Sequence, residues 1–124
     1  LFKAIVAVAP VTDLAKLRGD REVYSDYKLV DAMIGNGPHV SEGSPAQNAG
    51  AIQVPVLMFH GDMDANVDIS QSQLMEGKLR SAGKRVELVT FAGLTHSLID
   101  AEARTTVLSR SDAFLRANLG LAAN

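Results

Sequence analysis

Three apolar segments constrain the fold of this chain more than any other feature. They are KAIVAVA (residues 3–9), VPVLMFH (residues 54–60) and RVELVTF (residues 85–91), and the first two show no alternation of apolar and polar residues. Strands that are apolar on both faces are typical of a parallel sheet covered by helices. Parallel strands also need long crossover connections, which are usually helical. The segments therefore predict an α/β fold with three parallel strands and flanking helices.

The sequence between the first two strands predicts helical and irregular structure. Residues 26–34 (DYKLVDAMI) are expected to form a helix, which the glycines and the proline at positions 35, 37 and 38 would end. Ser44 followed by Pro45 is typical of an N-cap and first helical residue, so a short turn of helix is expected there. The stretch 35–50 is predicted to be a long surface excursion within one domain.

Two further helices are predicted after the second and third strands. Asp68 and Gln71 have the spacing of a capping box, which predicts a helix over about residues 69–82 that ends at Gly83. The last helix is expected over about residues 99–119. The apolar residues expected on the buried faces are Ile69, Leu74, Met75 and Leu79 in the first of these helices, and Val107, Leu108, Ala113, Phe114 and Leu115 in the last.

The composition excludes several classes of partner and site. The net charge is -2 and the sequence has no basic stripe, so nucleic acid is not expected as a partner. No apolar run approaches the length of a membrane span, so no membrane partner is expected. The absence of cysteine excludes disulfides and thiolate metal sites. None of these features distinguishes a cytoplasmic from a periplasmic location.

Polar residues gather directly after the second and third predicted strands, in GDMDANVD (residues 61–68) and AGLTHS (residues 92–97). Ligands of open parallel sheets bind beyond the carboxyl ends of the strands, so Asp64 and His96 are expected at one edge of the sheet. A carboxylate can hold the tautomer of a histidine while the other ring nitrogen acts as a base. The pair would be two thirds of a hydrolase triad. The alternative is that Asp64 is a turn residue, as Asp62 is expected to be, and His96 is merely exposed.

Several motifs occur together in this part of the chain. They are His-Gly-x-x-Asp at residues 60–64, Ser-Gln-Ser at residues 70–72 and Gly-x-x-His at residues 93–96. In this combination residues 54–98 resemble the end of the catalytic domain of the prolyl oligopeptidase family of serine peptidases, which includes dipeptidyl and acylaminoacyl peptidases. Residues 2–14 (FKAIVAVAPVTDL) resemble the strand that follows the nucleophile-bearing helix of that family. The resemblance implies that residues 1–124 are a single partial domain, the C-terminal portion of an α/β-hydrolase fold.

The resemblance also implies roles for individual residues, and it implies no metal or cofactor. Asp64 matches the triad acid, which in this family lies four residues after the motif histidine, and His96 matches the triad base. The implied substrate-binding residues are Asn66, at a position that often reaches the substrate, Val67, which would line the pocket beside it, and Tyr24 and Tyr27, which lie where the family often builds its specificity pocket. A second interpretation of the tyrosines is that they pack their own loop.

The motif of the family nucleophile is absent from this sequence. A Gly-x-Ser-x-Gly elbow between a strand and a helix carries that serine, and none occurs in the 124 residues. Ser41 and Ser44 lie in VSEGSPA, where no buried strand precedes them and Pro45 follows. The serine is therefore expected upstream of Leu1, and the 124-residue chain alone is expected to be inactive.

The expected function is that of part of a serine peptidase that hydrolyses peptide bonds of short peptides. One alternative is a related esterase or dienelactone hydrolase-like enzyme, which shares both loops but differs in its pocket. Another is a catalytically inert fragment that self-associates. In each case the strand at residues 3–9 would have an unpaired edge, so it is expected to pair with the missing N-terminal part of the same protein or with a second copy.

Overall fold

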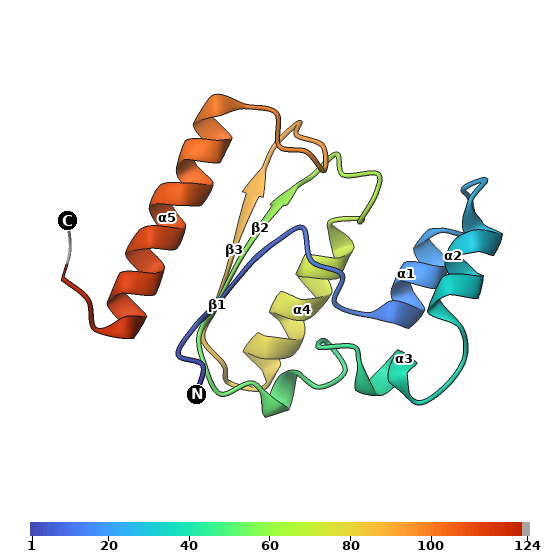
Figure 1. The fold of residues 1–124 in the computed structure, drawn as a ribbon, viewed down its shortest axis with the longest axis horizontal. Helices are drawn as coiled ribbons and strands as arrows, with labels where there is room; N and C mark the ends of the chain where they lie inside the picture. The colour runs from blue at the N-terminus through green and yellow to red at the C-terminus, as the bar shows by residue number, and fades with distance from the viewer. Residues whose placement is uncertain (123–124) are drawn as a thin grey trace.

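Three parallel strands form the centre of the computed structural model, which describes residues 1–122 (Figure 1). The strands are β1 (Ile5–Val8), β2 (Val56–Gly61) and β3 (Val86–Phe91), in the order β1-β2-β3. Both strand pairs are parallel, and Val56 is the partner of Ile5 on one side and of Val86 on the other. The predicted sheet is confirmed, and each strand begins and ends within two residues of its predicted bounds.

Helices connect the strands, as the parallel sheet requires. Figure 1 shows α4 and α5 on opposite sides of the sheet, with α1, α2 and α3 grouped beyond α4. Within residues 1–122 no helix combines the length and the apolar content needed to cross a bilayer. The helical segments are α1 (Leu14–Asp20), α2 (Tyr27–Ile34), α3 (His39–Glu42), the 3-10 helix η1 (Ala49–Ala51), α4 (Ser70–Ser81) and α5 (Ala101–Leu119).

The core lies around β2, the central strand, all of whose residues are buried. On one face, Met58 packs in a cluster with Met75 and Leu79 of α4. Both of these helix residues were predicted for its buried face. The ring of Phe59 stacks on that of Phe91 in β3, with 6.2 Å between their centroids. A strand with neighbours on both edges and helices on both faces is dehydrated along its whole length, so it fixes the position of whatever follows its carboxyl end.

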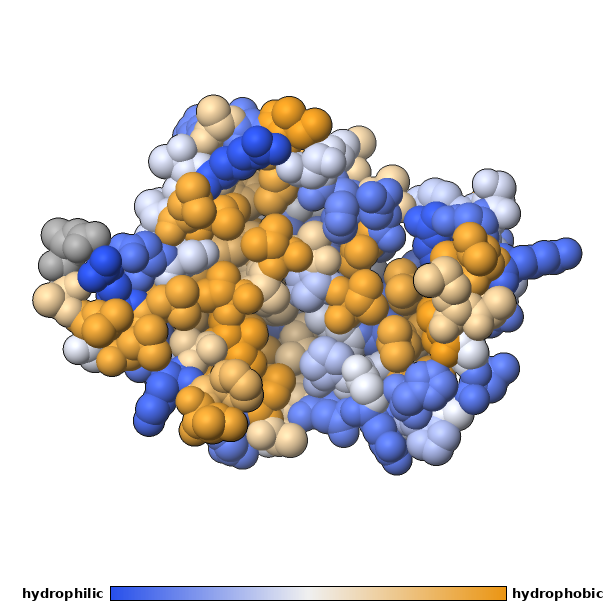
Figure 2. Space-filling view, viewed as in Figure 1, coloured by the Kyte–Doolittle hydropathy of each residue, from blue (hydrophilic) through white to orange (hydrophobic). Residues whose placement is uncertain are grey.

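β1 is less buried than predicted. Ile5 and Val8 are 36% and 47% exposed, although the sequence predicted a strand buried on both faces. The reason is that β1 pairs only with β2 among the described residues, so its other edge has no neighbouring strand. Figure 2 shows apolar side chains gathered over the part of the surface where β1 and α5 lie in Figure 1.

The predicted apolar stripe of α5 is only partly buried. Leu108 is 72% exposed and Ala113 is also exposed, so the prediction was wrong for these two residues. Val107 and Leu108 border a hollow of about 340 Å³ that Val8 and Leu98 also line. Since no side chain of residues 1–122 fills this hollow, the outer part of the stripe has nothing to pack against.

The predicted helix at Ser44 and Pro45 is not formed, because the serine makes tertiary hydrogen bonds instead. The Ser44 hydroxyl is buried, accepts a hydrogen bond from the Leu14 N–H at 2.9 Å and donates one to the Val40 carbonyl at 2.5 Å. Residues 45–48 form turns that lead into η1. Ser44 thus fixes the first residue of α1 rather than a helix of its own.

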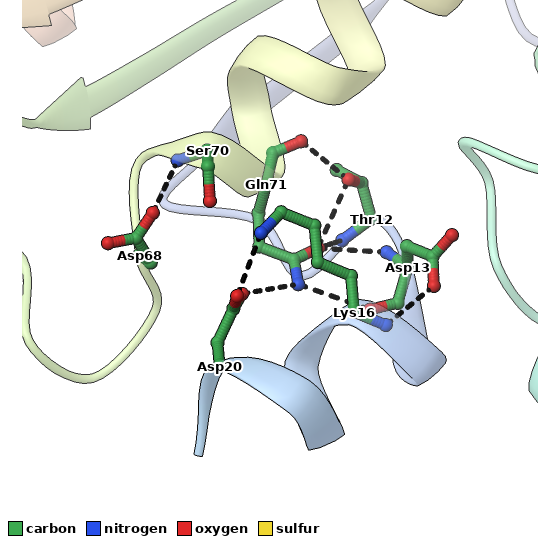
Figure 3. Close-up of polar contacts among 7 residues, drawn as sticks. All are labelled: Thr12, Asp13, Lys16, Asp20, Asp68, Ser70 and Gln71. Atoms are coloured by element: carbon green, nitrogen blue, oxygen red, sulfur yellow. Dashed lines mark hydrogen bonds and ion pairs between the residues drawn. The ribbon is translucent and has the colours of Figure 1, made fainter. Parts of the chain in front are cut away.

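Gln71 also makes tertiary contacts instead of completing a capping box. Asp68 does cap the start of α4, because its Oδ1 accepts a hydrogen bond from the Ser70 N–H at 2.9 Å. The buried Gln71 side chain turns the other way, and its Oε1 accepts hydrogen bonds from the N–H groups of Thr12 and Asp13, both at 2.9 Å (Figure 3). The Thr12 hydroxyl donates to the Gln71 carbonyl at 2.6 Å. These contacts hold the segment after β1 against the first turn of α4.

Replacing Gln71 by alanine is expected to lower the free energy of unfolding by about 2–4 kcal/mol, because it leaves two buried N–H groups without an acceptor. Gln73 lies on the same helix and is exposed, so Gln73→Ala is the matched control, with an expected change within about 0.5 kcal/mol. Urea unfolding followed by far-UV circular dichroism measures both, since the chain has no tryptophan. Equal unfolding midpoints for the two variants would contradict this role of Gln71.

Candidate active site

The loops that follow β2 and β3 are joined beyond the ends of the strands. The Asp62 N–H donates to the Phe91 carbonyl and the Met63 N–H to the Leu94 carbonyl, both at 3.0 Å. The Asp62 side chain crosses to the other loop, where its Oδ1 accepts a hydrogen bond from the Gly93 N–H at 2.7 Å. Asp62 therefore bridges the two loops, which is a larger role than that of the turn residue the sequence predicted.

Gly61, the last residue of β2, is required by the closeness of these loops. A Cβ atom at this position would lie 2.2 Å from the Leu94 carbonyl oxygen and 2.8 Å from its carbon. Cβ atoms do not approach backbone atoms this closely, so only glycine fits without moving the loops apart. The contact keeps the residues after β2 next to those after β3.

Asp64 and His96 meet at this junction. The His96 Nδ1 lies 2.7 Å from the Asp64 Oδ2, as the order of the strands predicted. The Asp64 side chain is completely buried, whereas the His96 side chain is 40% exposed. In residues 1–122 no hydroxyl group hydrogen-bonds to the His96 ring. The imidazole is thus held through one nitrogen and remains open on the side of the solvent.

The Asp64 carboxylate is held by main-chain groups of its own loop. Its Oδ1 accepts hydrogen bonds from the N–H groups of Asn66 and Val67, both at 2.9 Å. Burial alone would raise the pKa of Asp64, but the hydrogen bonds from the Val67 N–H, from His96 and from the Asn66 N–H outweigh burial and lower the pKa below its ordinary value. The carboxyl group is therefore ionised at neutral pH and can accept the hydrogen of the His96 Nδ1.

The predicted substrate-binding residues lie in two places. Asn66 and Val67 follow Asp64 in its loop, and the side chain of Asn66 is exposed while that of Val67 is half-buried. Tyr24 lines a hollow of about 270 Å³ together with Ala65 of the same loop. Tyr27 begins α2 and does not line this hollow. The structure thus brings Tyr24, but not Tyr27, to the hollow beside the acid loop.

Arg21, which the sequence did not indicate as a site residue, holds the segment of Tyr24 against the acid loop. The Arg21 Nη1 donates to the Ala65 carbonyl at 3.0 Å, and its guanidinium lies 4.2 Å from the centre of the Tyr24 ring. A second guanidinium nitrogen pairs with Asp26 at 2.5 Å. No sequence signal marks this role, because the contact with the acid loop is made to a main-chain carbonyl 44 positions away.

The sequence indicates His60 only as part of a motif, but its side chain contacts the acid. Its Nε2 lies 3.2 Å from the Asp64 Oδ2, and both side chains are completely buried. A histidine at the end of an otherwise apolar strand was the signal that could have identified it. Within residues 1–122, no three histidine, aspartate or glutamate side chains are placed to share a metal ion.

Comparison with known proteins gives consistent results. The sequence model described as "Prolyl oligopeptidase family" matches residues 1–122. The uncharacterized peptidase YuxL of Bacillus subtilis is 26% identical over 100 residues, which cover 78% of this chain and 15% of that protein.

Two solved structures are also similar. A puromycin-hydrolyzing peptidase of Mycobacterium tuberculosis superposes with a TM-score of 0.85 and 26% identity over 98% of this chain and 19% of its own. The Thermogutta terrifontis esterase 2, in a structure phosphoramylated by tabun, gives a TM-score of 0.75 and 28% identity over 98% of this chain and 44% of its own. The chain thus spans less than half of each of these proteins.

Proposed function

Because this chain belongs to the prolyl oligopeptidase family of serine hydrolases, we propose that Asp64 and His96 are the acid and the base of a peptidase catalytic triad. The observation that carries the proposal is the 2.7 Å contact between the His96 Nδ1 and the buried Asp64 Oδ2. The lowered pKa of Asp64 supports it, since a triad acid acts as a carboxylate. No cofactor or metal enters this chemistry.

The nucleophile in this proposal is a serine upstream of residue 1, because the 124 residues contain no Gly-x-Ser-x-Gly elbow. The serine oxygen attacks the carbonyl carbon of the scissile bond while the His96 Nε2 takes its proton, and the imidazolium then protonates the leaving amine. Water, deprotonated by the same nitrogen, releases the acyl group. Asp64 holds the ring in the tautomer with hydrogen on Nδ1 and stabilises the imidazolium.

The proposed substrates are short peptides. The hollow beside the acid loop supports binding of a substrate side chain near Tyr24, and the exposed side chain of Asn66 is available for a polar contact next to it. Val67 would border the same region. Tyr27 does not line the hollow, so its proposed role is to hold the nearby segment of Tyr24 in position. The scissile bond would lie at the exposed face of His96.

The proposed partner of β1 is another part of the same polypeptide, so that residues 1–124 are one portion of a larger α/β-hydrolase domain. The exposed outer edge of β1 supports this proposal, as does the apolar hollow between Val8 and Leu108. The greater length of the similar proteins supports it as well. A second copy of the chain is the alternative occupant of this edge.

An esterase is the second candidate function. The similarity to the Thermogutta terrifontis esterase 2, which is 28% identical over 98% of this chain, supports it. Both candidates would use Asp64 and His96 in the same roles. They differ in the leaving group, which is an amine for a peptidase and an alcohol for an esterase.

A fluorophosphonate probe tests the proposed function in the complete polypeptide that includes these residues. We expect labelling of a single serine outside residues 1–124, and loss of that labelling in His96→Gln because the serine is no longer deprotonated. His39→Gln, which changes an exposed histidine on α3, is expected to label normally. Hydrolysis of dipeptidyl and aminoacyl amides identifies a peptidase, and hydrolysis of esters alone identifies an esterase. Absence of labelling in the unmodified protein would contradict both functions.

A further inference from the structure

His60 is completely buried, and three groups surround its two ring nitrogens. Its Nδ1 lies 2.7 Å from the Ser72 hydroxyl on α4. Its Nε2 lies 2.8 Å from the Val67 carbonyl oxygen and 3.2 Å from the Asp64 Oδ2. Every polar atom of the ring therefore has a partner, and one of these partners is the proposed triad acid.

These partners fix the position of the ring hydrogen. A carbonyl oxygen can only accept a hydrogen bond, so the His60 Nε2 must carry the hydrogen. The Nδ1 of the neutral ring is then an acceptor, and the Ser72 hydroxyl can donate to it. The Nε2–H donates to the Val67 carbonyl, and the same nitrogen lies 3.2 Å from the Asp64 Oδ2, so the N–H dipole faces the carboxylate. The Val67 carbonyl thus sets the tautomer of His60, and Ser72 holds the ring through its other nitrogen.

The contacts of His60 and Val67 form a closed arrangement around the acid. The Val67 N–H donates to the Asp64 Oδ1 at 2.9 Å, while the Val67 carbonyl accepts from His60, which also faces the Asp64 Oδ2. Rotation of the carboxylate would therefore break contacts on both of its oxygens. The His60 ring is in turn held by α4 through Ser72, so the orientation of the acid is tied to the core of the domain.

Two imidazoles share one oxygen of the acid. The Asp64 Oδ2 faces the His96 Nδ1 at 2.7 Å and the His60 Nε2 at 3.2 Å. Two main-chain N–H groups donate to Oδ1 and the His96 Nδ1 donates to Oδ2, so three hydrogen bonds hold the carboxylate and the contact with His60 adds to them. A histidine with only a packing role would not need to contact the Asp64 Oδ2, the oxygen that also contacts His96.

We propose that His60 is a positioning residue for the reaction: it holds the Asp64 carboxylate in the orientation that His96 requires, and Ser72 holds the ring of His60 in place. The proposal rests on the proposed roles of Asp64 and His96. His60 does not touch the substrate in this scheme, so its removal should slow the chemical step while leaving substrate binding almost unchanged.

The test compares four variants of the complete polypeptide. His60→Leu removes all three contacts and is expected to lower kcat about 10- to 100-fold with KM within about threefold, since a displaced acid misaligns the base. His60→Gln keeps a donor at the ε position and is expected to recover kcat to within about fivefold of the unmodified enzyme. Ser72→Ala, which removes only a hydroxyl group, is expected to lower kcat about 3- to 10-fold. His39→Gln is the matched control.

A spectroscopic measurement separates positioning from packing. With [15N]histidine labelling, long-range 15N–1H correlation spectra show which ring nitrogen carries hydrogen. We expect hydrogen on the Nε2 of His60, and faster exchange with water of the His96 Nδ1 hydrogen in His60→Leu. A folded His60→Leu variant with unchanged kcat would overturn the proposal. If that variant does not fold, unchanged kcat in Ser72→Ala would overturn it instead. Full activity of Asp64→Asn would instead overturn the proposed function, whatever the His60 variants show.

Discussion

Replacing His96 by alanine in the complete polypeptide is expected to lower kcat by about six orders of magnitude, and Asp64→Asn by about four. The loss is larger for the base, since without it the serine keeps its proton. Asparagine at position 64 has nearly the shape of aspartate, but it lacks the charge that stabilises the imidazolium and holds the tautomer of His96. Steady-state hydrolysis of a chromogenic peptide substrate measures both effects, and KM should change much less than kcat.

The neighbouring carboxylate is the matched control for this prediction. Asp62 lies two residues before Asp64 and accepts one hydrogen bond from the Gly93 N–H, which an asparagine oxygen can also accept. Asp62→Asn is therefore expected to keep kcat within about threefold. The double variant of Asp64 and His96 should be no slower than His96→Ala, because the two residues act as a unit. Loss of activity in Asp62→Asn with an active Asp64→Asn would show that the acid was assigned wrongly.

Gly61→Ala is expected to lower the free energy of unfolding by roughly 3–5 kcal/mol, or to prevent folding altogether. The added methyl group would lie 2.2 Å from a carbonyl oxygen of the main chain, which cannot move without separating the acid loop from the histidine loop. The hydrogen bond between Asp64 and His96 should be lost at the same time. Urea unfolding measures the stability, and the proton spectrum of the histidine rings reports on the contact.

The control for Gly61 is Gly77, which lies within α4 and would have no atom within 4 Å of an added Cβ. Gly77→Ala is expected to raise the free energy of unfolding by about 0.5–1 kcal/mol, because alanine loses less conformational freedom in a helix. If the free energy of unfolding falls in Gly61→Ala and rises in Gly77→Ala, the loss comes from the close approach at Gly61. A loss of similar size in both variants would contradict it.

Features that depend on local sequence could be predicted, and features that depend on distant partners could not. The three strands follow from apolar runs, and α2 from its apolar pattern and the glycine that ends it. Ser44 and Gln71 have the local pattern of capping residues, yet the side chain of each accepts hydrogen bonds from N–H groups near the start of α1, 30 to 59 positions away. Such contacts exist only after the chain has folded, so spacing within one segment cannot indicate them.

The same limit applies to the site. Asp64 and His96 could be placed together because parallel strands bring their carboxyl ends to one edge of the sheet. His60 and Arg21 act through side-chain directions and main-chain carbonyls, neither of which a sequence pattern specifies. The family resemblance implies the same role for Tyr24 and Tyr27, whereas only Tyr24 lines the hollow beside Ala65.

The hydrogen bonds that join the two loops beyond β2 and β3 also bear on how the site forms during folding. Asp64 and His96 are 32 residues apart, and the sequence between them contains α4 and β3. A single strand-helix-strand unit therefore closes the pair. Because this unit contains both residues, the acid and the base can pair without more distant segments of the polypeptide. The nucleophile then joins a base whose orientation is already fixed.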